Sequence, residues 1–98
     1  MNHSKEAEMA KARFRLGRLV STPGALEHVS HGEMMRAIAR HTTGDWGTVC
    51  SEDAEANEAA VHERARLLSA YTTEDGVRFW IITEADRSVT TVLLPEEY

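Results

Sequence analysis

Apolar and polar positions alternate along the last third of the chain in the manner of β-strands. Three segments rich in β-branched and aromatic residues, 66–72, 77–83 and 88–94, are separated by two short polar stretches. The first stretch contains Glu-Asp-Gly at 74–76, which is typical of a hairpin turn. Pro95 follows the third segment and should end it, because proline has no amide hydrogen to donate to a sheet. The pattern predicts a three-stranded antiparallel meander.

The middle segment of this meander is apolar on both sides. Val77, Phe79 and Ile81 would point to one face, and Trp80 and Ile82 to the other. This is typical of a central strand that is covered on both faces. If helices cover only one face, the face with Trp80 is available to a partner protein or to a second copy of the chain. The alternative is that an N-terminal strand or arm folds over it.

The N-terminal half predicts one short strand and three helices. Residues 1–13 have helical composition but few apolar side chains, so we expect a frayed helix or a mobile arm. Residues 14–20 alternate as an edge strand does, with Gly17 as a candidate bulge. A hydroxyl residue followed by proline at 22–23 should begin a short helix that runs to about residue 29.

Two longer helices should follow. Ser30 and Glu33 match a capping box, which predicts a helix over 31–41. Its buried stripe is expected to contain Met34, Met35, Ile38 and Ala39. The glycine-rich stretch 42–47 should be a loop, and Ser51 can cap an acidic helix that runs to about residue 64.

Together these elements predict one α+β domain over residues 14–98, preceded by the arm 1–13. Two or three helices should pack on a small, mostly antiparallel sheet of about four strands. A chain of 98 residues with 42% hydrophobic residues can build one core but not two. The single cysteine cannot form an internal disulfide, and neither the polar start nor any apolar run predicts secretion or a membrane span. We therefore expect a cytoplasmic protein, with no cofactor and no metal site.

Charge is distributed unevenly along the chain. The net charge is −5, but residues 1–20 carry five basic and two acidic side chains, so the remainder carries −8. A surface of that sign repels phosphate, so nucleic-acid binding is not expected except through the basic N-terminal arm. A protein partner with a basic surface is easier to accommodate. The simpler interpretation is that the negative charge only keeps the domain soluble.

One set of residues suggests an enzyme. Helices that precede a small antiparallel sheet are also found in barnase-like and RelE-like ribonucleases. On that analogy His41 or Glu84 would be the base, Arg87 would hold a phosphate, and Thr91 or Tyr71 would orient it. The ordinary interpretation of the turn at 84–87 is a solvated ion pair between Glu84 and Arg87.

A second set suggests protein binding. Glycines flank Asp45 and Trp46, so the indole could anchor a contact with Asp45 as its polar neighbour, or could plug the core beneath the loop. The residues that we expect at a partner-binding surface are Asp45, Trp46, Trp80, Glu84, Asp86 and Arg87.

Three stretches carry a family resemblance: Phe-x-Leu-Gly-Arg-Leu-Val-x-Thr-Pro-Gly-Ala-Leu at 14–26, Gly-Asp-Trp-Gly at 44–47, and the long segment from Trp80 to Tyr98. Over residues 14–98 the chain resembles a family of small uncharacterised bacterial proteins found largely on plasmids and integrated mobile elements. Members are often labelled modification subunits of type I restriction systems. A methyltransferase of that kind needs a glycine-rich cofactor loop and an Asn-Pro-Pro-Phe-like motif, and this chain has neither, so we reject the label.

The resemblance implies no particular activity. With the charge pattern, it favours a non-enzymatic binding or accessory protein of mobile DNA that acts through protein contacts, with inhibition of a host defence complex as one hypothesis. Two alternatives remain: a small ribonuclease-like toxin and a structural dimerisation module.

Overall fold

The structure is a computed structural model that describes residues 12–98. The predicted arm 1–13 therefore lies almost entirely outside the described residues. The elements in chain order are β1 (Arg18–Ser21), α2 (Pro23–His28), α3 (His31–Thr42), α4 (Ser51–Glu63), β2 (Leu67–Thr72), β3 (Arg78–Thr83), β4 (Val89–Leu93) and the 3₁₀ helix η1 (Pro95–Glu97).

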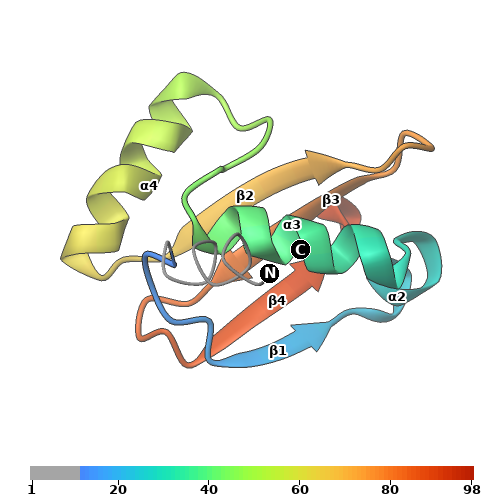
Figure 1. The fold of residues 1–98 in the computed structure, drawn as a ribbon, viewed down its shortest axis with the longest axis horizontal. Helices are drawn as coiled ribbons and strands as arrows, with labels where there is room; N and C mark the ends of the chain where they lie inside the picture. Colours follow the sequence, from blue (N-terminus) through green and yellow to red (C-terminus); the bar gives the residue numbers. More distant parts are fainter. Residues whose placement is uncertain (1–11) are drawn as a thin grey trace, which may run out of the picture.

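The four strands form one sheet in the order β1-β4-β3-β2. The pairs β2–β3 and β3–β4 are antiparallel, and β1 runs parallel to β4. In Figure 1, α3 crosses one face of the sheet, α2 lies at the end of β1, and α4 stands beside the start of β2. The predicted fold class, helices on a mostly antiparallel four-stranded sheet with a C-terminal meander, is confirmed. The interior position predicted for 77–83 is occupied by β3.

Short polar side chains begin the two helices on the sheet face. Thr22 accepts a hydrogen bond from the amide of Ala25 at the start of α2, and Ser30 accepts one from the amide of Glu33 at the start of α3. The buried side chains of α3 differ from the predicted stripe. Both Met35 and Ala39 are exposed, which corrects the prediction for these two residues. The buried side chains are Met34, Ala37, Ile38 and His41.

Two further boundaries differ from those predicted. The first strand begins at Arg18 instead of Phe14, since Gly17 has a left-handed φ of 66° and lies against the backbone of Arg87 and Ser88. Helix α4 is preceded by Cys50 at its N-cap, so Ser51 is the first helical residue and not the cap.

The buried apolar residues form two clusters. The larger cluster fills the space between the sheet and α2 and α3, with Phe79, Ile81 and Val92 from the strands. The smaller lies between α4 and the start of β2, and its buried members are Trp46, Ala60 and Leu67. On the opposite face of the sheet, the ring of Tyr98 packs edge-on against Trp80, with centroids 5.7 Å apart.

The outer edge of β2 is covered by hydrogen bonds from outside the sheet. The side-chain amide of Asn57 in α4 donates to the carbonyl of Leu68 at 2.8 Å and accepts from its amide at 3.2 Å. Next to it, the amide of Ala70 donates to the carbonyl of Trp46, and the amide of Thr48 donates to the carbonyl of Ala70. The loop comes this close because residue 47 is glycine: a Cβ there would overlap the Ala70 carbonyl.

Within residues 12–98, no helix has the length and apolar character that crossing a membrane requires.

Candidate binding surface

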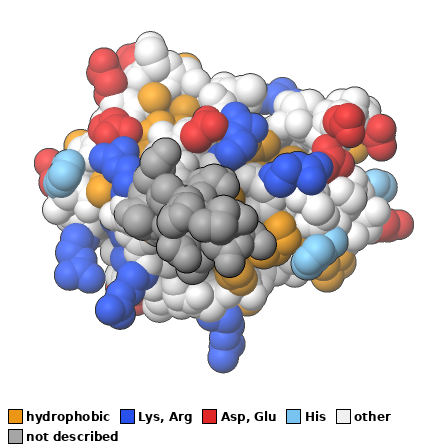
Figure 2. Space-filling model, viewed as in Figure 1, with side chains coloured by type: hydrophobic (Ala, Val, Ile, Leu, Met, Phe, Trp, Pro, Cys, Tyr) orange, Lys and Arg blue, Asp and Glu red, His pale blue; other side chains and the backbone are white. Residues whose placement is uncertain are grey.

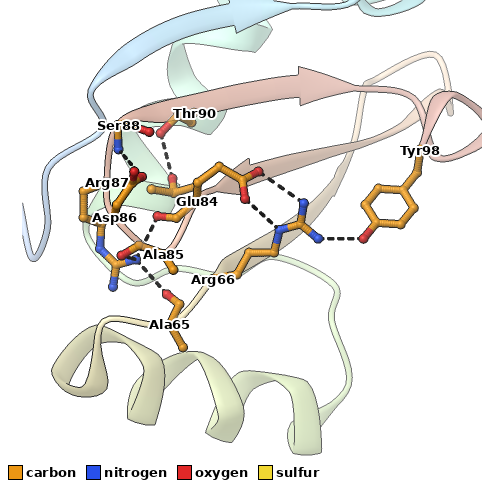
Figure 3. Close-up of polar contacts among 10 residues, drawn as sticks. Ala65, Arg66, Glu84, Ala85, Asp86, Arg87, Ser88, Thr90 and Tyr98 are labelled. Atoms are coloured by element: carbon orange, nitrogen blue, oxygen red, sulfur yellow. Dashed lines mark hydrogen bonds and ion pairs between the residues drawn. The ribbon is translucent and has the colours of Figure 1, made fainter.

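The turn between β3 and β4 is held by a dense set of hydrogen bonds (Figure 3). The amide of Arg87 donates to the carbonyl of Glu84 at 2.9 Å, and the amide of Glu84 donates to the carbonyl of Val89 at 3.1 Å. The carboxylate of Asp86 accepts from the amide of Ser88 at 3.0 Å. Hydrogen bonds from Ser88 lower the pKa of Asp86, so its carboxylate is charged at neutral pH. Hydrogen bonds within the turn therefore hold it in one conformation, with a charged carboxylate at Asp86.

Arg87 joins this turn to the end of α4. Its backbone is left-handed, with φ of 61°, and its side chain is buried with 8% exposure. The guanidinium donates to the carbonyls of Ala65 at 2.6 Å, Ala60 at 2.9 Å and Glu84 at 3.1 Å. Burial, and then the positive charge of Arg64, lower the pKa of Arg87. Since the guanidinium N–H groups already donate to backbone carbonyls, the phosphate-holding role predicted for Arg87 has no support here.

Glu84 pairs with a partner that the sequence analysis did not assign. Its carboxylate lies 3.2 Å from Nε and 3.2 Å from Nη2 of Arg66, a two-point pair, whereas the prediction paired it with Arg87. Nη1 of Arg66 donates to the hydroxyl of Tyr98 at 2.6 Å (Figure 3). Hydrogen bonding to Glu84, and then to Tyr98, raises the pKa of Arg66. Arg66 and Glu84 are both partly exposed, so water can replace either partner.

Trp46 occupies the position of a core plug. Its side chain is 6% exposed, its ring stacks on Phe14 with centroids 6.2 Å apart, and its Nε1 donates to Glu58 at 3.0 Å. Asp45 is exposed and pairs with Nε of Arg40 at 2.7 Å, and this hydrogen bond lowers the pKa of Asp45. Of the two interpretations of this loop, the buried indole favours the plug. Asp45 remains accessible to a partner.

His41 lies at the centre of a buried polar cluster that we call the hydroxyl cluster: His41, Ser69, Thr83 and Thr90. The imidazole has 0% exposure, with Nδ1 2.6 Å from Oγ of Ser69 and Nε2 2.9 Å from Oγ1 of Thr83. Oγ1 of Thr83 lies 2.7 Å from Oγ1 of Thr90, and the hydroxyl of Thr90 donates to the carbonyl of Leu16 at 2.7 Å. Burial, and then the charge of Arg87, lower the pKa of His41 to about 4. The ring is therefore neutral at neutral pH and has no contact with solvent.

The structure does not bring the predicted catalytic residues together at one accessible place. Thr91 pairs with Ile82 and so points away from the face that holds His41, whereas the neighbouring Thr90 points toward it. Tyr71 donates its hydroxyl to the carbonyl of Asp45 at 2.6 Å, and burial raises its pKa to about 12. These geometries are those of structural residues.

Helix α4 presents carboxylates outward. Only Asn57 and Ala60 are buried in its 13 residues. Glu52, Glu55 and Glu63 are exposed and spaced by three and eight residues, so they follow one side of the helix, which we call the acidic stripe. Figure 2 shows acidic side chains over the upper part of α4, with basic side chains gathered below it.

The basic side chains near α4 surround a hollow of about 540 Å³. Arg13, Arg15, Arg64 and Arg87 line it together with Asp86. The sequence analysis missed this grouping, because its members come from three separate segments that only the folded chain brings together. Arg13 is partly neutralised by Glu58, at 2.9 Å. The acidic stripe and this hollow give opposite charges to two neighbouring parts of the surface.

No known protein family, no curated protein and no solved structure matches this chain. In the part of the chain that the structure describes, no three His, Cys, Asp or Glu side chains converge as metal ligands. The exposed carboxylates of α4 and the arginines around the neighbouring hollow are suited to charged contacts with another macromolecule.

Proposed function

We propose that the protein is a non-enzymatic binding protein that acts through protein–protein contacts, with the acidic stripe of α4 and the Glu84–Ser88 turn as its contact surface. The observation that carries the proposal is the exposure of α4: its carboxylates point outward, and its buried residues are Asn57 and Ala60 alone. A helix whose apolar side chains are mostly small contributes little to the core. Its exposed carboxylates are therefore better explained by a role in binding than by a role in folding.

Rigid attachment of this surface supports the proposal. Asn57 ties the middle of α4 to β2, and Arg87 ties its last turn to the β3–β4 turn through the carbonyl of Ala60. A surface that is already ordered loses little conformational entropy on binding. Charged groups held in fixed positions also favour one partner orientation over others.

The partner that fits this surface is a protein with a basic groove. Carboxylates spaced along a helix can occupy a groove that otherwise holds a phosphate backbone, because the charges correspond in sign. The resemblance to proteins of plasmids and integrated elements suggests that the groove belongs to a host complex that acts on foreign DNA. On this proposal the protein inhibits such a complex by occupying its nucleic-acid site.

The ribonuclease-like toxin has less support. His41 is buried, Arg87 is bound to carbonyls, and Glu84 is paired with Arg66. A general base must reach the proton that it removes, and His41 cannot do so without local unfolding. Growth arrest on expression, relieved by Glu84→Gln, would favour the toxin over the binding protein.

Charge reversal on the stripe tests the proposal. The stripe variant is Glu52→Lys, Glu55→Lys, Glu63→Lys; the control reverses three exposed acids elsewhere, Glu27→Lys, Glu74→Lys and Asp75→Lys, for the same change in net charge. Each full-length chain is used to capture proteins from a bacterial lysate at physiological salt, and recovery is quantified by mass spectrometry. We expect the stripe variant to lose about tenfold or more of the captured partner, since like charges across an interface oppose binding.

The control variant should lose less than about twofold, which corresponds to under 0.5 kcal/mol. Equal recovery by all three chains would contradict the proposal, as would a wild-type chain that recovers nothing above a mock bait. Circular dichroism of both variants checks that α4 still forms.

A further inference from the structure

The outer edge of β1 differs from the covered edge of β2. The amide of Arg18 donates to the carbonyl of Ser88 at 2.9 Å, and the amide of Thr22 donates to the carbonyl of Val92 at 3.0 Å. In a parallel pair, residues that bond to the neighbour alternate with residues that face away. The amides and carbonyls of Leu19 and Ser21 therefore point outward, and they have no hydrogen-bond partner in the described part of the chain.

Apolar side chains gather beside these backbone groups. Leu19 is 46% exposed, Val20 38%, and Leu26, in the helix that follows β1 directly, 65%. They are three of the five large hydrophobic residues that are exposed among residues 12–98. Native proteins usually cover or charge an exposed edge strand, because its free groups pair readily with another strand. An edge with open backbone groups and exposed aliphatic side chains is suited to receive one.

We propose that β1 pairs antiparallel with β1 of a second copy of this chain, around a two-fold axis at Val20. In this register Leu19 faces Ser21 of the second copy and Ser21 faces its Leu19, so the outward groups exchange four N–H···O bonds. The two Val20 side chains meet at the axis. The result is a symmetric dimer in which the two sheets join into one of eight strands.

Charge complementarity selects a second copy over a strand from another protein. In the same register Arg18 lies opposite Thr22 of the second copy, and side chains of opposed residues point to the same face. The hydroxyl of Thr22 donates to Glu97, whose carboxylate also accepts from the amides of Gly24 and Leu94, each at 2.9 Å. A fixed carboxylate thus stands beside the position that Arg18 reaches. The two-fold axis forms this contact between Arg18 and Glu97 twice, while the two Arg18 side chains stay apart.

This dimer would leave the acidic stripe free. Since β1 and β2 are the two ends of the sheet, pairing through β1 lies at the end opposite α4. Two acidic stripes would then stand at the two ends of the joined sheet. The dimer proposal does not depend on the binding function, and either can fail alone.

Sedimentation equilibrium of the full chain, from low to high micromolar concentration, tests the dimer. We expect the average mass to rise from one chain to two. Leu19→Pro should keep the protein monomeric, because proline removes the outward amide of residue 19 and leaves the bonds between β1 and β4 intact. Arg18→Glu should weaken association about tenfold by placing a carboxylate against Glu97. Single-chain mass at every concentration, or a dimer that survives Leu19→Pro unchanged, would overturn the proposal.

Cross-linking tests the register independently of how well Leu19→Pro folds. In a Cys50→Ser background, Val20→Cys places two thiols at the axis, where Cα atoms of a non-hydrogen-bonded antiparallel pair are about 4.5 Å apart, within disulfide range. Mild oxidation should give a covalent dimer in high yield. Ala59→Cys in the same background is the control: Ala59 is exposed on α4, at the end of the sheet opposite β1, and equal cross-linking there would contradict the register.

Discussion

Two adjacent residues, Thr83 and Glu84, belong to polar groups of opposite character. Thr83 is buried in the hydroxyl cluster, where His41 and Thr90 meet it without any ionised partner. Glu84 lies at the surface, where it pairs with Arg66. The two groups make similar numbers of hydrogen bonds, but only the buried one excludes water. The difference indicates that burial, and not the number of bonds, decides how much each group contributes to stability.

Complete hydrogen bonding explains why the buried hydroxyl cluster is stable. Within residues 12–98, every buried side-chain nitrogen and oxygen has a hydrogen-bond partner. Removal of one member leaves its neighbours without partners in a place that water does not reach, which is costly. At the surface, water replaces a lost partner and the cost is small. The following predictions test this contrast, from the largest expected effect to the smallest.

His41→Ala should lower the free energy of unfolding by about 4 kcal/mol, because it creates a cavity and removes the imidazole partner of Ser69 and one of the two hydrogen-bond partners of Thr83. Urea denaturation followed by circular dichroism measures the change. His62→Ala, an exposed histidine on α4, is the control and should change stability by less than about 0.5 kcal/mol. A loss at His41 as small as the control would remove the contrast between the two groups.

Acid should destabilise the fold in the range in which His41 would titrate when unfolded. The pKa of His41 falls from 6.5 to about 4 on folding, so the stability that its neutral form contributes is complete above pH 6.5. That contribution is lost as the pH falls toward 4 and amounts to about 3 kcal/mol, at 1.36 kcal/mol for each pKa unit. Urea denaturation measured at several pH values across this range gives the slope of the free energy of unfolding against pH.

In the described part of the chain, four carboxylates also have lowered pKa values, but their contribution to stability is lost only below their ordinary values, 3.8 for Asp45 and Asp86 and 4.5 for Glu58 and Glu97. The slope above pH 5 therefore belongs to histidine. His41→Asn should flatten it. A slope that persists in that variant would contradict the assignment.

Arg87→Lys should lower the free energy of unfolding by about 2 kcal/mol, less than His41→Ala and more than loss of the surface pair. A lysine cannot donate to the carbonyls of Ala60, Ala65 and Glu84 together. Arg64→Lys is a matched control. Arg64 has a similar left-handed φ of 57° but is exposed, so its replacement should cost less than about 0.5 kcal/mol. Thermal or urea unfolding compares them; equal losses would place the effect in backbone conformation.

Breaking the surface pair should have the smallest effect. Arg66→Met and Glu84→Gln should each lower stability by less than about 1 kcal/mol, and their coupling in a double-mutant cycle should be about 0.5 kcal/mol. The coupling should shrink in high salt, which screens exposed charges. Coupling above about 2 kcal/mol, insensitive to salt, would show that the surface group resembles the buried one after all.

The sequence predicts what depends on neighbours along the chain. The meander follows from local alternation and turn residues, and the start of α3 follows from the Ser30 cap. The side of α3 that is buried was predicted less well. A polar residue such as His41 looks like surface until Ser69 and Thr83, 28 and 42 residues away, are known to meet it. Local patterns do not contain such pairings.

The candidate surface divides in the same way. An acidic α4 could be predicted, because charge and helical spacing are both visible in the sequence. The partners of Glu84 and Arg87 could not: Arg66 and the carbonyls at the end of α4 reach this turn only through the packing of α4 beside β2. Trp46 was left between two interpretations, and its place beneath α4 was decided by Phe14 and Glu58, which are distant in sequence.

Asn57 also limits how large an assembly of these sheets can become. Its amide occupies both backbone groups of Leu68, so a strand cannot add at that end without first displacing α4. Two chains joined through β1 would expose only such blocked ends. Growth would stop at a pair, so Asn57 and the loop at 46–48, which bonds to Ala70, would together separate a finite complex from an open-ended fibre.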